Sequence, residues 1–183
     1  MDKKIEFYKN YIEEFSNILT QIEPDQFKES IKFVEHCNRN GGKLIIVGNG
    51  GSASISSHVA VDFTKACGIR SINFNEPNLL TCFSNDFGYE NWVSEALKAY
   101  SDPNDLVILI SSSGTSPNIL NAADFCIEHE LNLITFSGFS EKNILKKKGQ
   151  INFWVNSNSY NFIEMAHHVW LVCMVDYLSS VEK

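Results

Sequence analysis

Residues 43–52 read KLIIVGNGGS, an apolar run that gives way to glycines and a serine. A short, continuous run of apolar residues is typical of a strand that is buried on both faces of a sheet. Residues 106–117 read LVILISSSGTSP and repeat this pattern, with an apolar run, a loop of small residues and a proline. The two stretches predict an α/β fold with strands at 43–47 and 106–110, in a parallel sheet that is flanked by helices on both faces.

The sequence on either side of these two stretches extends the α/β pattern. Apolar residues at helical spacing predict two amphipathic helices in residues 1–40, ahead of the first strand. Residues 43–183 are expected to form an α/β core that ends in a long, apolar helix. The further elements predicted in this core are strands at 71–74, 79–83, 131–136 and 151–155, and helices at 52–66, 90–100, 117–129, 141–147 and 161–180. Because no repeat or long linker interrupts it, the whole chain, 1–183, is expected to be one domain.

The composition of the chain excludes several classes of protein. Its 183 residues are 44% hydrophobic and 20% charged, which is typical of a soluble globular domain and not of a disordered chain. The net charge of −7 argues against nonspecific binding of nucleic acid. No apolar run approaches the ~18 residues of a membrane span, and no secretory signal is expected. Five scattered cysteines without a CxxC pair indicate reduced thiols and a cytoplasmic location.

The loops that follow the two central strands carry the chemistry that the sequence offers. Residues 48–52 and 111–116 consist almost entirely of glycine, serine, threonine and asparagine, and each loop opens a predicted helix. Small residues let the backbone approach an anion, and a helix N-terminus offers unpaired N–H groups and a partial positive charge. Neither loop carries the Walker A lysine or the GxGxxG pattern of dinucleotide sites. The loops therefore predict a site for a phosphate monoester, the alternative being that they only form tight turns and helix caps.

Three motifs together, GNGGS, SNDFG and SSSGTS, resemble the SIS (sugar isomerase) domain family. Within that family they resemble the phosphoheptose isomerase branch, which interconverts sedoheptulose 7-phosphate and a heptose 7-phosphate. The resemblance covers nearly the whole chain. It implies a five-stranded parallel sheet, a homotetramer with active sites between its subunits, and a small sugar phosphate as ligand. Because the nucleotide motifs, a basic face and a long apolar run are all missing, no nucleotide cofactor, nucleic-acid partner or membrane is expected.

The resemblance also implies which residues bind the sugar phosphate. The first loop and the NDFG motif would contact the sugar, and the second loop would hold the phosphate. The implied substrate-binding residues are Asn49, Gly50, Gly51, Ser52, Asn85, Asp86, Ser111, Ser112, Ser113 and Ser116.

Zinc and proton transfer are implied for residues on two helices. In the family, a His and a Glu four residues apart on the helix after GNGGS bind zinc, and here these positions are His58 and Asp62, which share a helix face. The family's Gln on the last helix falls on Glu164, but its His falls on Val172, which can neither bind a metal nor carry a proton. His168 lies one turn after Glu164. The expected Zn²⁺ ligands are His58, Asp62, Glu164 and His168, and the expected catalytic residues are Asp62, Glu164 and His168.

Two functions remain open at this point. The first is an aldose–ketose isomerase that acts on a sugar phosphate, as in the phosphoheptose isomerase branch. The second is a non-catalytic SIS-domain protein that binds a sugar phosphate and acts as a regulator or binding partner. The replacement of the family's histidine by Val172 favours the second function, whereas the complete set of loop serines and the presence of His58 and Asp62 favour the first.

Overall fold

The sheet is built around the two apolar runs. In the computed structural model, which describes residues 2–181, every strand pair is parallel and the strand order is β2-β1-β3-β4-β5. Every residue of the neighbouring strands β1 and β3 is buried, as expected of strands that are covered on both faces. The strands are β1 (Leu44–Gly48), β2 (Ser71–Ile72), β3 (Leu106–Ser111), β4 (Asn132–Ser137) and β5 (Ile151–Trp154).

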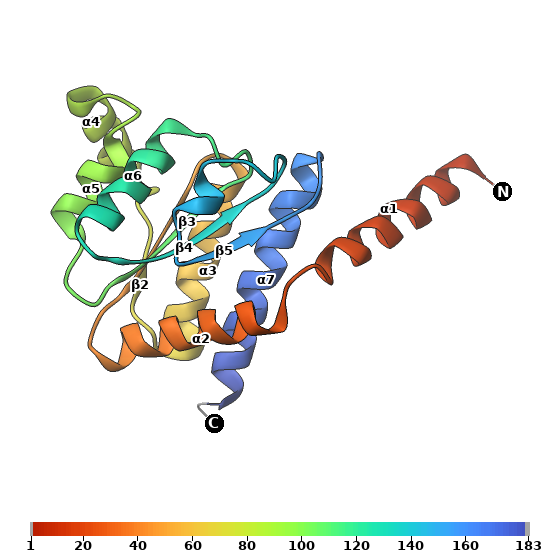
Figure 1. The fold of residues 1–183 in the computed structure, drawn as a ribbon, viewed down its shortest axis with the longest axis horizontal. Coiled ribbons are helices and arrows are strands. Elements are labelled where there is room, and N and C mark those ends of the chain that lie inside the picture. Colours follow the sequence, from red (N-terminus) through yellow and green to blue (C-terminus); the bar gives the residue numbers. More distant parts are fainter. Residues whose placement is uncertain (1, 182–183) are drawn as a thin grey trace.

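Helices cover both faces of this sheet (Figure 1). Strand side chains alternate between two apolar cores, since Ile46 packs with α2, α3 and α7 while Ile45 packs with α5 and α6. The helices are α1 (Lys3–Leu19), α2 (Pro24–Arg39), α3 (Gly51–Cys67), α4 (Pro77–Phe87), α5 (Trp92–Tyr100), α6 (Pro117–Glu128) and α7 (Tyr160–Val181), with a 3₁₀ turn η1 (Leu145–Lys147). None of the helices in residues 2–181 is long and apolar enough to cross a membrane.

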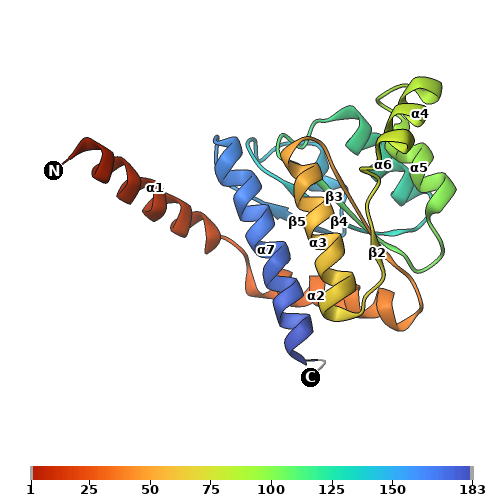
Figure 2. The same cartoon turned by 180° about the vertical axis from the view of Figure 1, so that it is seen from behind.

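Helix α1 points away from the sheet (Figures 1 and 2). The C-terminal half of α1, nearer α2, packs on α7. There the ring centroids of Tyr11 and Phe15 lie 4.5 and 5.8 Å from the ring centroid of Phe162. Large apolar side chains elsewhere on α1 are exposed to solvent: Ile5, Phe7, Tyr8 and Ile12.

The observed elements confirm the predicted fold class, including the two N-terminal helices and the long last helix. One prediction is wrong, because residues 79–83 lie inside helix α4 and do not form a strand. Pro77 occupies the first turn of α4, and the Glu76 carboxylate accepts a hydrogen bond from the Leu79 N–H at 2.8 Å, so this sequence is capped as a helix. The largest differences in length are at β2, which has two residues where four were expected, and at η1, which covers three residues of the helix expected at 141–147.

Candidate active site

The loops after β1 and β3 meet at a cavity of about 120 Å³. It lies at the carboxyl ends of the strands, where parallel α/β sheets bind their ligands. The residues that line it are Asn49, Ser52, Ile110, Ser111, Ser112, Ser113, Ser116, Tyr160 and Glu164. The structure thus brings most of the predicted substrate-binding residues to one place.

The first loop is held by its asparagine. Gly50 has a φ of +55°, which lets the chain turn from β1 into α3. The Asn49 side chain exchanges two hydrogen bonds of 2.9 Å with the Asn118 amide on α6, and its Oδ1 also accepts a hydrogen bond from the Tyr89 hydroxyl at 3.2 Å. These bonds fix Asn49 at the edge of the cavity. Ser52, in the first turn of α3, is buried beside it.

The second loop turns several hydroxyl groups toward one another. Ser111 Oγ donates to Ser116 Oγ at 3.1 Å, and Ser113 Oγ accepts from the hydroxyl of Thr115 at 3.1 Å. Ser112 Oγ is buried and has no hydrogen-bond partner within the described residues. Because α6 begins directly after the loop, its unpaired N–H groups add to these hydroxyl donors. Such a site suits a dianionic phosphate.

The NDFG motif lies apart from this cavity. Asn85 and Asp86 are exposed on the last turn of α4, where the Asn85 amide donates to the Asp86 carboxylate at 2.8 Å. Neither side chain lines the cavity. Tyr89, three residues after Asp86, reaches the site through its hydrogen bond to Asn49.

Glu164 is the predicted catalytic residue that lies in the cavity. Its carboxylate packs against the α-carbon of Gly51, so that a β-carbon at position 51 would lie 2.3 Å from Glu164 Oε2. The carboxylate therefore faces the amino end of α3, where a negative charge is favoured. Glu164 and the loop serines can act on one bound molecule.

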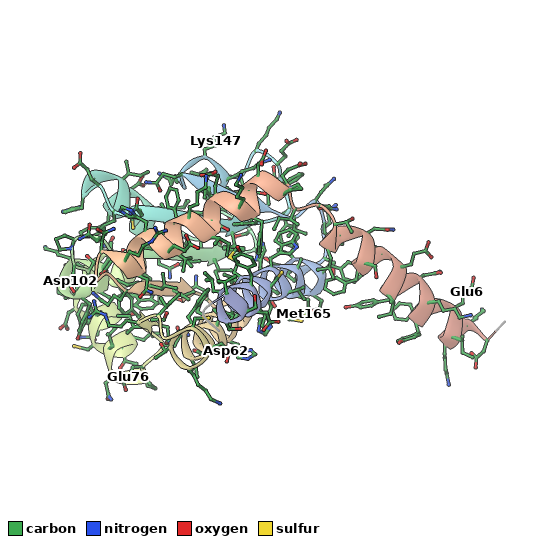
Figure 3. The ribbon with its side chains drawn as sticks, turned by 90° about the horizontal axis from the view of Figure 1, so that it is seen from below. Glu6, Asp62, Glu76, Asp102, Lys147 and Met165 are labelled. Carbon is green, nitrogen blue, oxygen red and sulfur yellow. The ribbon has the colours of Figure 1, made fainter. Side chains whose placement is uncertain are left out.

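The other predicted catalytic residues form a chain on the outer side of α3 and α7. His58 Nε2 lies 3.1 Å from Asp62 Oδ2, and His58 Nδ1 lies 2.8 Å from His168 Nε2. Partial burial and the neighbouring His58 lower the pKa of His168, while Asp62 opposes this shift. One imidazole of the pair must accept the shared hydrogen bond, so at least one ring is neutral. Asp62 marks this side of the molecule in Figure 3, together with the exposed Met165.

Comparison with known proteins agrees with this arrangement of loops and helices. Residues 10–138 match the sequence model of the SIS domain. The chain belongs to the SIS domain family. Its relatives include "Phosphoheptose isomerase 2" of Campylobacter jejuni, 40% identical over 108 residues that make up 56% of this chain and 54% of the relative. The phosphoheptose isomerase of Syntrophotalea carbinolica is 29% identical over 184 residues, which are 94% of this chain and 92% of the relative.

The fold of this SIS domain is also found in solved structures. The phosphoheptose isomerase GmhA from Neisseria gonorrhoeae superimposes with a TM-score of 0.86, covering 96% of this chain and 98% of that chain at 22% sequence identity. This match confirms the predicted fold and its five-stranded parallel sheet.

The four expected zinc ligands of this SIS domain do not form one cluster. Within residues 2–181, no group of three or more His, Cys, Asp or Glu side chains could hold a metal ion. Two ligands on one tetrahedral zinc, with bonds of about 2.0–2.1 Å, stand roughly 3.3 Å apart, whereas His58 Nδ1 and His168 Nε2 are 2.8 Å apart and directly hydrogen-bonded. Glu164 is turned away, toward Gly51. This arrangement of residues does not fit the expected zinc site.

His167, the neighbour of His168, has a structural role. It is completely buried, and its Nε2 donates a hydrogen bond to the backbone carbonyl of Ser137 at 3.0 Å. Burial lowers its pKa from 6.5 to about 4, although the hydrogen bond to Ser137 opposes this shift. His167 is therefore neutral at physiological pH and stays outside the cavity.

Tyr160 is a residue of the site that the sequence reasoning did not identify. It begins α7 and lines the cavity, and its ring packs edge-on against Phe139 with 4.6 Å between ring centroids. The side chain is 59% exposed, so it lies at the mouth of the site. Its position four residues before Glu164 was the available signal, because residues at this spacing share a helix face.

Proposed function

We propose that the chain is an aldose–ketose isomerase that acts on a sugar phosphate, with sedoheptulose 7-phosphate as the substrate to test first. The observation that carries this proposal is that one cavity holds both the loop serines and the carboxylate of Glu164. A phosphate site beside a carboxylate is what this reaction requires. The names of the relatives support the same activity and the same class of substrate.

The phosphate end of the substrate would bind in the second loop. The hydroxyls of Ser111, Ser113 and Ser116 and the N-terminus of α6 can each donate a hydrogen bond to its oxygens. Ser112 is proposed to take part through its unpartnered hydroxyl. A cavity of about 120 Å³ holds a phosphate group but not a seven-carbon sugar, so the sugar would extend outward past Tyr160 and Asn49. We further propose that Asn85 and Asp86 contact the sugar where it extends beyond the cavity.

Isomerisation requires a base that moves a proton between neighbouring carbons. The base removes a proton from the carbon beside the carbonyl, which gives an enediol, and then returns it to the former carbonyl carbon. We assign this role to Glu164, because its carboxylate lines the cavity, and not to Asp62, whose carboxylate lies beside His58. A second group must move a proton between the two oxygens. His168 lies outside the cavity, one turn after Glu164 on α7, and it is proposed for this step because the sugar would extend beyond the cavity; His58 and Asp62 stand behind it as a hydrogen-bonded chain.

Paired substitutions of the two carboxylates test this assignment. Glu164→Gln keeps the shape of the side chain and removes the base, so kcat for a ketose phosphate should fall by about 10²–10⁴-fold. The dissociation constant for inorganic phosphate should change little. The matched variant Asp62→Asn should lose much less activity. If Asp62→Asn abolishes turnover while Glu164→Gln does not, the base is Asp62 and our assignment is wrong.

The second candidate function is a non-catalytic sugar-phosphate-binding protein that regulates or binds a partner. Val172 at the position of the family's histidine favours it, as does His58, both of whose ring nitrogens lie against protein side chains. Calorimetric binding of ketose phosphates without turnover by the unmodified protein would establish this function instead. The assay should be run with added Zn²⁺ and with a chelator. Our mechanism contains no metal step. Activity that depends on zinc would therefore support a zinc site formed by His58, Asp62, Glu164 and His168, as the sequence predicted.

A homotetramer with sites between its subunits is the assembly that we propose. The exposed apolar side chains of α1 support it, as do those along α3 and α7, where His58 and His168 lie among Val61, Met165 and Val169. A second copy that covers this face would shield the histidine pair from water. The cytoplasmic location stays a prediction from the sequence.

A further inference from the structure

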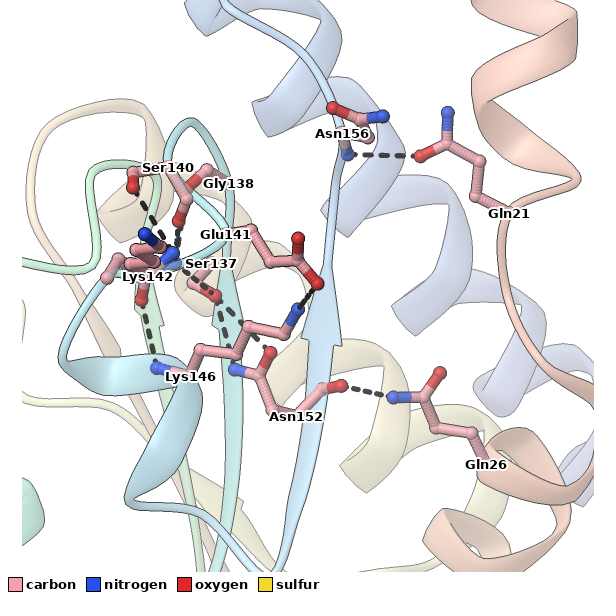
Figure 4. Close-up of polar contacts among 11 residues, drawn as sticks. Gln21, Gln26, Ser137, Gly138, Ser140, Glu141, Lys142, Lys146, Asn152 and Asn156 are labelled. Carbon is pink, nitrogen blue, oxygen red and sulfur yellow. Dashed lines mark hydrogen bonds and ion pairs between the residues drawn. The ribbon is translucent and has the colours of Figure 1, made fainter.

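The loop between β4 and β5 contains a buried amide, Asn143, which is only 3% exposed. Its Nδ2 donates to the Ser140 carbonyl at 2.8 Å and lies 3.3 Å from the Gly138 carbonyl and from Ser137 Oγ. Its Oδ1 accepts from the backbone N–H of Lys146 at 2.9 Å. Figure 4 labels these partners, Ser137, Gly138, Ser140 and Lys146, which lie near the end of β4. Every polar atom of the side chain is therefore used to hold this loop in one conformation.

The same amide packs against the second loop, residues 111–116, which we call the serine loop. A β-carbon on Gly114 would lie 2.1 Å from Asn143 Oδ1 and 2.4 Å from its Cγ, so the amide packs directly on the backbone of Gly114. Two residues later, the N–H of Leu145 donates to the Gly114 carbonyl at 3.1 Å. Gly114 itself has a φ of +63° and donates its N–H to the Ser111 carbonyl at 2.9 Å. Gly114, at the centre of the serine loop, is thus held in place by Asn143 and Leu145 of the β4–β5 loop.

We propose that Asn143 is a positioning residue for phosphate binding. It does not line the cavity, but it fixes Gly114 and thereby the hydroxyls of Ser111, Ser113 and Ser116 around the place of the phosphate. A loop that is ordered before the ligand arrives binds more tightly, because ordering it does not then oppose binding. This inference rests on the proposed function, since it concerns the phosphate site of that function.

Asn152 on β5 provides a matched control. Its Nδ2 donates to Thr135 Oγ1 at 2.8 Å and to Ser137 Oγ at 3.2 Å, so it belongs to the same network (Figure 4). None of its hydrogen bonds reaches residues 111–116 within the described part of the chain. Asn143→Ala and Asn152→Ala each remove a hydrogen-bonded amide of the same size, but only the first removes the support of Gly114.

Calorimetry with inorganic phosphate, at a temperature where circular dichroism shows both variants folded, is the primary test. We expect the dissociation constant of Asn143→Ala to rise about tenfold or more, and that of Asn152→Ala to stay within about twofold. With a ketose phosphate, the Asn143 variant should show a raised KM and a nearly unchanged kcat. Should Asn143→Ala not fold, Asn143→Ser keeps a donor and should shift the constant in the same direction. Equal effects of the two variants, or no effect of either, overturn the proposal.

Amide hydrogen exchange separates this proposal from the proposed function. Exchange at the N–H groups of Gly114 and Leu145 should accelerate in Asn143→Ala and not in Asn152→Ala, whether or not any ligand binds. If the unmodified protein binds no phosphate, the proposed function fails, and the exchange rates still show whether Asn143 orders the loop. Unchanged protection of Gly114 in Asn143→Ala overturns the positioning role.

Discussion

Because Gly51 contacts the Glu164 carboxylate, a substitution at Gly51 can test the role of Glu164 as the base without changing Glu164 itself. A methyl group at position 51 would meet the Glu164 carboxylate at 2.3 Å, and this carboxylate is the end of a flexible side chain that can move aside. Gly51→Ala should therefore change the free energy of unfolding by less than about 1 kcal/mol, since alanine is favoured over glycine in a helix. Turnover should fall, because the carboxylate leaves the cavity. Kinetics and urea denaturation of the same preparation give both quantities.

Gly50 serves as the control for this variant. A β-carbon at Gly50 would meet no other atom within 4 Å, but its φ of +55° makes alanine strained. With a ψ of −122° as well, Gly50 has a backbone conformation that alanine rarely adopts, so Gly50→Ala should lose about 1–3 kcal/mol of stability while leaving Glu164 in place. Full activity in Gly51→Ala would show that Glu164 is not needed where it stands.

His167 makes stability depend on pH. Its pKa in the folded protein, about 4, lies below the ordinary value of 6.5, so the unfolded chain binds the proton more tightly. Neutral His167 therefore adds to the free energy of unfolding, by about 3 kcal/mol at most. This stabilisation is complete above pH 6.5 and is lost as the pH falls from 6.5 toward 4. Unfolding by urea at several pH values should show this loss in the unmodified protein.

Replacing His167 by glutamine, which can still donate to the Ser137 carbonyl, should flatten the dependence between pH 6.5 and 4. An equally steep slope in the His167 variant would mean that other groups cause the acid sensitivity.

At the scale of the elements, strands and loops could be predicted better than the grouping of side chains. The unbroken apolar runs of β1 and β3 and the small residues after them indicated both the sheet and the phosphate loop, because backbone geometry follows directly from such sequences. Residues 79–83 were misleading, since the apolar run LLTCF suits a strand and only the cap at Glu76 and Pro77 favours a helix.

The spacing of residues along two helices explains why the expected metal site was not found. Glu164 and His168 share a face of α7, but four residues of helix separate them by about 6 Å along its axis. Side chains on a helix also lean toward its N-terminus, which carries Glu164 toward the cavity and Gly51. His58 lies seven residues into α3 beyond Gly51, roughly 10 Å along that axis. Shared faces were visible in the sequence, whereas position along the axis depends on how α3 and α7 are offset.

At the scale of the molecule, the exposed side chains of α1 predict a stable assembly. We expect light scattering to give about four times the 20.7 kDa chain mass. The double variant Phe7→Lys with Ile12→Lys should yield smaller species, because it places charges on side chains that are 70% and 44% exposed and that a tetramer would bury. Ile127→Lys, at a 52% exposed position on α6, should leave the mass unchanged. A monomer at micromolar concentration in the unmodified protein would contradict the assembly and any site between subunits.

The parallel pairing of β1 with β3 has a consequence for how the chain folds during synthesis. Leu44 is paired with Leu106, and no hairpin joins any two strands of the sheet. About sixty residues must therefore leave the ribosome before β1 acquires this neighbour, and such distant contacts make folding slow. Through that interval the apolar run of β1 depends on α2, α3 and the two-residue β2 for cover. Translation that pauses before residue 106 would thus leave the chain open to chaperones, proteases and aggregation.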